Sequence, residues 1–313
     1  MAETVLAVRR LCKQYGGTLA LDHVDLHVDR GQIYGLVGKN GAGKTTLIRT
    51  VTAQTIPTSG EIELFGATGE RELRHMRARL GAVVETPSFY PFLTAAQNLE
   101  YYRLQRGIAG KTCVEEALQL VGLTGTGRKK FKNFSLGMKQ RLGLALSIMS
   151  QPDFLILDEP INGLDPTGIV QFREILQRLN EEKNTTILIS SHILSELSNL
   201  ATHYGFIDGG HMLQQISARE IAERCRECLE LLVSDTEKAA VALERDLGID
   251  AFEILPENRI RLYALVNEPG KVAQVLAAAG VVLTGINTRG TNLEEYFLSL
   301  IGETQKGGPS CSM

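Results

Sequence analysis

The sequence predicts an α/β fold for residues 1–215, with a parallel sheet covered by helices, and a smaller α+β domain for residues 216–302. In the first part, short β-rich runs alternate with helical patterns, and a glycine-rich loop joins one such run to a helix. After Gln215 the pattern changes to strand, helix, strand, strand, helix, strand, which is the ferredoxin-like order. We expect residues 303–313, which are rich in Gly and Ser, to form a disordered tail.

Four buried strands are predicted in the first part, at 33–37, 81–85, 154–158 and 186–190. Two capping boxes, Thr94 to Gln97 and Thr112 to Glu115, predict the first turns of helices. The elements of the second part are predicted as strands at 228–233, 251–255, 259–265 and 281–287 and helices at 235–247 and 269–279.

Composition excludes several classes of protein. The chain has 313 residues, which suits one large and one smaller domain, and its 43% hydrophobic and 22% charged residues are typical of a globular protein. The formal net charge of −3 gives no general electrostatic case for binding nucleic acid. No run approaches the roughly 18 apolar residues that span a bilayer, and the N-terminal residues lack a secretory pattern. We therefore expect no nucleic-acid partner and no direct membrane insertion.

The glycine-rich loop spans residues 38 to 45 and has the form G-x-x-x-x-G-K-T. Its glycines let backbone N–H groups turn toward phosphate oxygens, and the helix that follows adds partial positive charge. Lys44 is expected to reach the β- and γ-phosphates, and Thr45 to offer its hydroxyl to Mg²⁺. The nucleotide-binding residues predicted here are Gly38, Lys39, Asn40, Gly41, Ala42, Gly43, Lys44, Thr45 and Thr46.

Two carboxylates follow the apolar run 154–157. Ligands bind at the carboxyl ends of strands in open α/β sheets, so Asp158 is predicted to hold Mg²⁺. Glu159 is predicted to orient or deprotonate the attacking water. A helix cap after a strand is the simpler interpretation of such a pair, but the phosphate loop upstream favours catalysis. No Asn-Lys-x-Asp motif for guanine is found, which disfavours a GTPase.

The segment Phe134 to Arg141 precedes the Asp-Glu strand by one amphipathic helix. Here the chain resembles the ATP-binding subunit of ABC transporters, although Leu136, Met138 and Lys139 depart from the family's common LSGGQ signature. The resemblance covers residues 4–215 by motif and extends more weakly to residue 302. It implies a P-loop NTPase of ABC type, a parallel or mixed sheet with a helical subdomain. It also implies that Ser135, Gly137 and Met138 touch the nucleotide of the opposite subunit, so that the site is completed in a dimer.

Other landmarks of the family follow in order. The run Gly163 to Pro166 resembles the D-loop, which crosses the dimer interface. His192 lies where the family's switch histidine contacts the γ-phosphate, and Tyr15 lies where an aromatic ring stacks on adenine. The other five histidines match no motif, and we expect them to have no special role. The five cysteines are scattered, as expected for reduced thiols.

The segment from Leu80 to Thr94 occupies the place of the family's Q-loop, whose Gln coordinates Mg²⁺ and senses the membrane partner. Here that position is Glu85, and the segment resembles the subgroup that exports bacitracin and confers self-immunity to lantibiotics. Glu85 is therefore predicted to be a metal ligand that also couples the site to the partner. Glu85 could also merely replace Gln as an oxygen ligand.

The resemblance thus implies an ATPase that uses ATP and Mg²⁺ as the motor of a bacterial exporter of antimicrobial peptides. It would act as a homodimer or in paired nucleotide-binding domains, on an integral-membrane permease, as a peripheral protein at the cytoplasmic face of the cell membrane. A lipid, polysaccharide or drug exporter, an importer, and a soluble ABC-type ATPase acting on ribosomes or DNA are the alternatives. The predicted docking surface for the permease consists of Pro87, Phe89, Tyr90, Pro91 and Phe92, unless Phe89 and Phe92 are core residues.

Overall fold

The computed structural model describes residues 3–85, 88–290 and 293–306. The chain divides into two compact units, the first comprising residues 1–218 together with 301–313, and the second residues 219–300. The domain boundary predicted after residue 215 lies close to this division, and we keep it as a proposal.

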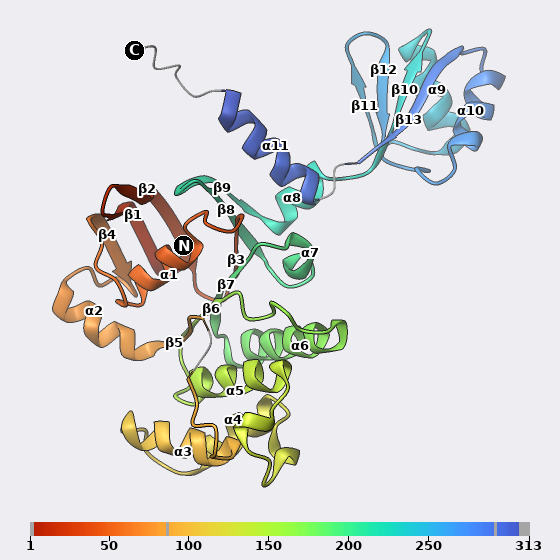
Figure 1. Ribbon diagram of the computed structural model, residues 1–313. Helices are drawn as coiled ribbons and strands as arrows, with labels where there is room; N and C mark the ends of the chain where they lie inside the picture. Colours follow the sequence, from red (N-terminus) through yellow and green to blue (C-terminus); the bar gives the residue numbers. More distant parts are fainter. Residues whose placement is uncertain (1–2, 86–87, 291–292, 307–313) are drawn as a thin grey trace. The chain divides into compact units, whose positions relative to one another are not determined.

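The first unit is built on a six-stranded sheet with the strand order β5-β6-β7-β3-β8-β9 (Figure 1). Its neighbours from β5 to β8 pair in parallel, and β9 pairs antiparallel with β8. Every residue of β3, β6 and β7 is buried, as apolar runs covered on both faces require. The strands are β3 (Ile33–Val37), β5 (Leu80–Val83), β6 (Phe154–Asp158), β7 (Thr186–Ser191), β8 (His203–Asp208) and β9 (His211–Ser217).

Strands are present at all four predicted positions; β5 begins one residue earlier and β7 ends one residue later than predicted, and the larger difference is at the end of β5. That strand was predicted to run to residue 85, but β5 ends at Val83. The reason is conformational, because Glu85 has a φ of 59°, which lies outside the β region and interrupts regular strand pairing. Glu85 therefore lies on a turn beyond the sheet.

A second sheet of three antiparallel strands has the order β2-β1-β4. It consists of β1 (Thr4–Tyr15), β2 (Thr18–Asp29) and β4 (Ser59–Leu64). Helix α1 (Lys44–Val51) contributes Leu47 and Ile48 to a common apolar core with residues of β1 and β2 such as Leu6 and Val24. This core anchors the helix that follows the phosphate loop.

Helices α3, α4 and α5 pack against one another, and α5 packs against β5, forming a helical subdomain within the first unit (Figure 1). The capping box predicted at Thr94 is confirmed, since Thr94 and Gln97 exchange side-chain and backbone hydrogen bonds. The box predicted at Thr112 is wrong, because α4 already includes Thr112 and starts after Lys111. The helices of this unit are α2 (Glu70–Met76), α3 (Ala95–Gln105), α4 (Thr112–Leu120), α5 (Leu136–Ile148), α6 (Pro166–Lys183) and α7 (Leu194–Leu197).

The second unit contains a four-stranded antiparallel sheet with the order β11-β12-β10-β13. Helices α9 and α10 pack on each other, and apolar residues of both helices share one core with the sheet (Figure 1). This strand order supports the ferredoxin-like topology that we propose for the unit. Its elements are β10 (Cys228–Val233), α9 (Thr236–Leu247), β11 (Phe252–Leu255), β12 (Arg259–Leu262), α10 (Pro269–Ala278) and β13 (Leu283–Arg289).

Helix α8 (Ala218–Arg224) precedes the four-stranded sheet of the second unit, and α11 (Leu293–Lys306) is the last element. The disordered tail was predicted to begin at residue 303, but residues 303–306 continue this helix. Residues 307–313 of the predicted tail lie outside the described residues.

Candidate active site

The loop between β3 and α1 is shaped by two glycines that no other residue could replace. A Cβ on Gly38 would lie 2.4 Å from the carbonyl oxygen of Ile207. Gly43 has a φ of 108°, and a Cβ there would lie 2.9 Å from the carbonyl oxygen of Ala20. Both positions therefore exclude side chains, and the chain can turn tightly into the first residue of α1. The amino end of that helix opens onto a cavity suited to anions.

Lys44 is the first residue of α1, and its side chain is only 4% exposed. Its Nζ donates hydrogen bonds to the carbonyl oxygens of Gly38, at 2.6 Å, and Lys39, at 3.1 Å. The same nitrogen lies 3.2 Å from Oε1 of Glu159. The ammonium is thus folded back over the loop, where a phosphate oxygen could take the place of the carboxylate.

Asp158 is the last residue of β6, and it is buried between two hydroxyls. Its Oδ2 accepts a hydrogen bond from Thr45 Oγ1 at 2.8 Å, and its Oδ1 accepts one from Ser190 Oγ at 2.7 Å. Ser190 Oγ also accepts a hydrogen bond from the Glu159 N–H at 2.9 Å. A carboxylate next to a hydroxyl is a pair of oxygen ligands of the kind that Mg²⁺ prefers.

Ser190 is a residue that sequence reasoning missed. It lies on β7, opposite Asp158 in the register of the parallel pair β6 and β7. The signal that could have found it is this strand pairing, because parallel neighbours that end together place their last side chains at one edge of the sheet. His192 follows the same strand and was predicted from its position there.

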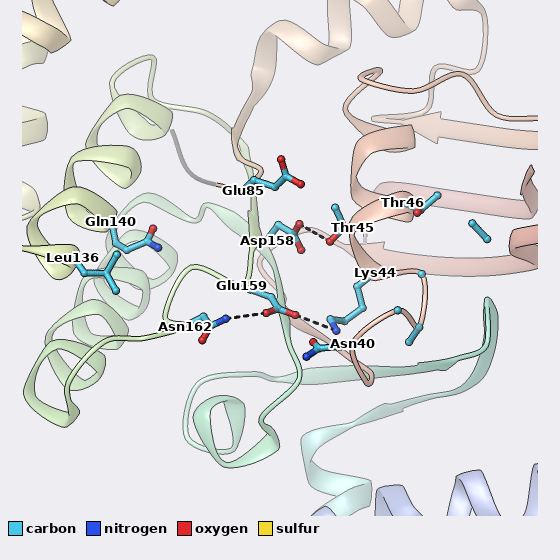
Figure 2. A pocket seen from close by; sticks show the side chains of 14 residues that line it. Asn40, Lys44, Thr45, Thr46, Glu85, Leu136, Gln140, Asp158, Glu159 and Asn162 are labelled. Carbon is cyan, nitrogen blue, oxygen red and sulfur yellow. Dashed lines mark hydrogen bonds and ion pairs between the residues drawn. The ribbon is translucent and has the colours of Figure 1, made fainter. Parts of the chain in front are cut away.

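Glu159 lies at the centre of the site and has a φ of 46°, in the left-handed region. Its Oε1 faces Lys44, and its Oε2 lies 3.1 Å from His192 Nδ1 and accepts a hydrogen bond from Asn162 Nδ2 at 3.4 Å. Figure 2 shows the carboxylate between Asn162 and Lys44. A non-glycine residue in this conformation is strained, and such strain recurs at functional sites.

Glu85, predicted as a metal ligand, lies in the same pocket beyond Asp158 (Figure 2). Its Oε1 lies 2.5 Å from Nη2 of Arg49, which is on α1, and its side chain is 63% exposed. The carboxylate is thus held by an arginine that the sequence reasoning did not connect with it. The structure places Glu85 in the cavity with Thr45 and Asp158, the other two predicted metal ligands. Its carboxylate forms an ion pair with Arg49 and contacts neither of them.

These side chains surround a cavity of about 550 Å³. Leu136 and Gln140 of α5 and Asn162 line it in addition to the predicted residues. The described lining consists of Ala20, Asn40, Gly41, Ala42, Gly43, Lys44, Thr45, Thr46, Glu85, Leu136, Gln140, Asp158, Glu159 and Asn162. The cavity is therefore formed where the phosphate loop, the end of β6 and the start of α5 meet.

Residues 21–162 match the family model described as ABC transporter. Over 300 residues the chain is 42% identical to the bacitracin transport ATP-binding protein BcrA of Enterococcus faecalis, which covers 96% of this chain and 97% of that protein. The chain belongs to the ABC transporter family. Within that family it is an ATP-binding subunit with ATPase activity, as predicted from the phosphate loop and the Asp-Glu pair.

Two further similarities agree with this assignment. The chain is 41% identical over 209 residues to the lantibiotic transport ATP-binding protein SrtF of Streptococcus pyogenes, covering 67% of this chain and 89% of that protein. It also resembles the dimeric post-hydrolysis structure of the ATP-binding cassette MJ0796 bound to ADP and Pi. That likeness has a TM-score of 0.62 at 22% identity and covers 68% of this chain and 99% of that one. At this identity the second likeness confirms the fold alone.

The ABC signature segment begins α5, where Ser135 is the N-cap and its Oγ accepts a hydrogen bond from the Met138 N–H at 3.3 Å. Ser135 and Gly137 line a second cavity, of about 390 Å³, together with Gly163 and Asp165 of the D-loop segment. Within one chain the signature and D-loop segments thus form a surface of their own beside the phosphate-loop cavity, with which they share Leu136.

Tyr15, predicted to stack on adenine, ends β1 with its side chain half-exposed. Its hydroxyl lies 3.2 Å from Thr55 Oγ1, and Lys13 Nζ lies 4.8 Å from the ring centroid. Tyr15 is not part of the described lining of the phosphate-loop cavity. The ring is available at the surface, and nothing packs it into the core.

The predicted docking surface is only partly exposed. Phe89 is buried at 9% exposure and packs against the rings of Tyr102 and Phe131, so for this residue the core interpretation holds. Tyr90 and Phe92 are 43% and 70% exposed, and Pro87 lies outside the described residues. No helix among the described residues is both long enough and apolar enough to cross a membrane.

Proposed function

We propose that this chain is the ATP-hydrolysing subunit of an exporter of antimicrobial peptides such as bacitracin. The observation that carries the proposal is the 42% identity to the bacitracin transport protein over 96% of the chain, which includes the second unit. The match to the lantibiotic transport protein covers 67% of the chain. Glu85 in place of the usual glutamine supports the same subgroup.

Nucleotide would bind through the backbone N–H groups of residues 38–46, with Lys44 on the β- and γ-phosphates. The oxygen pair formed by Thr45 and Asp158 fits Mg²⁺, which when bound neutralises charge on the phosphate oxygens. Thr45, Asp158 and, through its carboxylate, Glu85 are the residues that would hold the ion. Tyr15 would stack on the adenine ring.

Glu159 would act as the general base, because its carboxylate lines the cavity and is oriented by His192 and Asn162. In the structure Lys44 neutralises this carboxylate. When Lys44 turns to the phosphates, Glu159 becomes free to accept a proton from water, and His192 near the γ-phosphate would hold the base in position. The exchange of partners by Lys44 would therefore link nucleotide binding to catalysis.

Two chains, or two paired nucleotide-binding domains, would complete each site. The signature residues Ser135, Gly137 and Met138 begin a helix, whose N-terminus favours a phosphate. Ser135 and Gly137 share one cavity with the D-loop segment. This common surface would face the nucleotide of the opposite subunit.

The subunit would lie at the cytoplasmic face of the cell membrane through contact with an integral-membrane permease. Tyr90, Pro91 and Phe92 would form the docking surface, since Tyr90 and Phe92 expose apolar rings that no described core covers. This segment closely follows Glu85 in the chain, so it could report the state of the nucleotide to the permease.

The test is survival of a sensitive bacterium that expresses this chain with its permease. Growth is measured under bacitracin, a lantibiotic and an unrelated hydrophobic drug, and Glu159→Gln serves as the inactive control. We expect resistance to a peptide antibiotic that disappears in the control. Protection against the drug alone, or protection that survives in Glu159→Gln, would refute the proposed substrate class or the proposed motor role.

A further inference from the structure

A group of metal-ligating side chains lies outside the nucleotide site, on the antiparallel sheet. Among the residues that the structure describes, Cys12, Asp22 and His23 each offer one ligand atom, and these atoms lie within 4.8 Å of one another. We propose that Cys12 Sγ, the Asp22 carboxylate and His23 Nδ1 bind a zinc ion, with His211 as the fourth ligand. The histidines were expected from the sequence to have no special role, because nothing linear connects them with Cys12.

A β-bulge brings these side chains together. In the pairing of β1 with β2, Leu11 is opposite Val24 and Lys13 is opposite Leu21, with a register shift between them. Two residues of β2, Asp22 and His23, therefore stand against the single residue Cys12 of β1. Bulges redirect side chains and recur beside functional sites. Without this one, alternation along β2 would point Asp22 and His23 to opposite faces.

The bulge holds His23 in an unfavourable conformation, with a φ of 49°. This left-handed region is uncommon for residues other than glycine. The His23 N–H donates a hydrogen bond to Cys12 Sγ at 3.3 Å, and His23 Nδ1 lies 2.5 Å from Asp22 Oδ1. The backbone of His23 thus contacts Cys12, and its side chain contacts Asp22, the other two proposed ligands.

The hairpin turn between β8 and β9 supplies the fourth side chain. The Asp22 N–H donates a hydrogen bond to the carbonyl oxygen of Gly210 at 2.9 Å, which ties this turn to β2. The next residue is His211, whose Nε2 lies 3.5 Å from Asp22 Oδ2; it stands outside the group of three atoms within 4.8 Å and would turn toward them on metal binding. The side chains of His23 and His211 are both more than half exposed, so an ion could reach the group from solution.

The chemistry of the donors selects the metal. Thiolate, imidazole and carboxylate are all donors that zinc accepts, and four of them suit its tetrahedral coordination, whereas Mg²⁺ takes oxygen ligands and would stay at Thr45 and Asp158. On binding, the Cys12 thiol, which now contacts the carbonyl oxygen of Arg10 at 3.7 Å, would lose its proton to solvent. Hydrogen bonding from the His23 N–H would stabilise the resulting thiolate.

The experiment uses the full, reduced, metal-stripped chain without nucleotide and titrates it with Co²⁺. A thiolate-to-cobalt charge-transfer band should reach its full height at one equivalent and disappear when Zn²⁺ is added. An ion bound only at Thr45 and Asp158 gives no such band, because its ligands are oxygens. Wild-type protein that shows no band would overturn the proposal.

Matched variants locate the ion. Cys12→Ser keeps an acceptor for the His23 N–H and should abolish the band, and His23→Asn should weaken Co²⁺ binding by more than about tenfold. Cys113→Ser and the double variant Cys225→Ser with Cys228→Ser should keep the band. ATP binding, measured for each variant, shows that the fold is intact. A band that survives in both Cys12→Ser and His23→Asn, or a band that depends on Cys225 and Cys228, would refute the assignment. If one of the first two variants does not fold, the other is enough for this test.

Discussion

Lys44 Nζ lies 3.2 Å from Glu159 Oε1, so the residue expected to bind phosphate and the residue expected to activate water neutralise each other. Lys44 is almost completely buried, and a charge in such a place needs a partner. The phosphates of a nucleotide would replace Glu159 as that partner. The ion pair is therefore consistent with a base that is released only when nucleotide is bound.

Replacing Glu159 with Gln should separate binding from turnover. The change removes the base, so the ATPase rate should fall about 10²- to 10⁴-fold. It also removes the carboxylate that competes with phosphate for Lys44, so ATP affinity should stay equal or rise. Equilibrium ATP binding and steady-state hydrolysis measure the two effects. The exposed carboxylate Glu181 on α6 provides the control Glu181→Gln, and equal rates in the two variants would remove Glu159 from its role.

Ser190→Ala should disturb the metal ligand. The buried hydroxyl donates to the carboxylate of Asp158, which is also buried, and accepts from the N–H of the partly exposed Glu159. Its loss removes the hydrogen bond to Asp158 Oδ1 and the acceptor of the Glu159 N–H, while Thr45 still donates to Asp158 Oδ2, and it costs about 1–3 kcal/mol of stability. Because Asp158 is then less firmly oriented, half-maximal ATPase activity should require a higher Mg²⁺ concentration.

Ser191→Ala is the matched control for this prediction. Ser191 is equally buried, but its hydroxyl donates to Glu196 Oε2 at 2.8 Å and does not contact Asp158. Both variants should lose stability in chemical denaturation, and only Ser190→Ala should change the dependence on Mg²⁺. The same Mg²⁺ dependence in both variants would show that the Ser190 hydroxyl only stabilises the fold.

The parts of this molecule that the sequence predicts are those encoded by consecutive residues. Strands β3, β6 and β7 are continuous apolar runs because both of their faces are covered, and the phosphate loop and Asp158 with Glu159 are linear motifs. Ser190 reaches the site because β7 pairs with β6, and Arg49 reaches it from helix α1. No local sequence pattern indicates that either residue belongs to the site. The strand β2 was not predicted, since its bulge at Asp22 and His23 interrupts the alternation that would indicate a strand.

A chain that ends at residue 220 should still bind ATP. The phosphate loop, Asp158 and Glu159 all belong to the first unit. The shortened chain lacks the residues from 301 onward that are grouped with this unit, including the buried Ile301, so we expect lower thermal stability. ATP affinity and melting temperature measure the two effects. A folded product without ATP binding would show that the proposed domain boundary is misplaced.

Variants of Glu85 and Arg49 can separate a role in metal binding from a role in catalysis, because Glu85 lines the cavity but forms its ion pair with Arg49 of α1. An ion pair as exposed as this one contributes only about 0.2–1 kcal/mol. Arg49→Ala should therefore change ATP hydrolysis by less than about sixfold, since about 1.4 kcal/mol corresponds to tenfold. Glu85→Gln keeps an oxygen ligand and should preserve most of the basal ATPase while weakening peptide resistance in cells.

Glu85→Ala removes the oxygen altogether and should raise the Mg²⁺ requirement more than Glu85→Gln does. The measurement is the ATPase rate against Mg²⁺ concentration for the three variants, alongside survival under bacitracin. Position decides the expected outcome, because Glu159 directly follows the buried Asp158 at the end of the central strand β6, whereas Glu85 lies beyond β5 with its side chain 63% exposed. If Glu85→Gln abolished hydrolysis as completely as Glu159→Gln, Glu85 would have to be assigned a part in the chemical step itself.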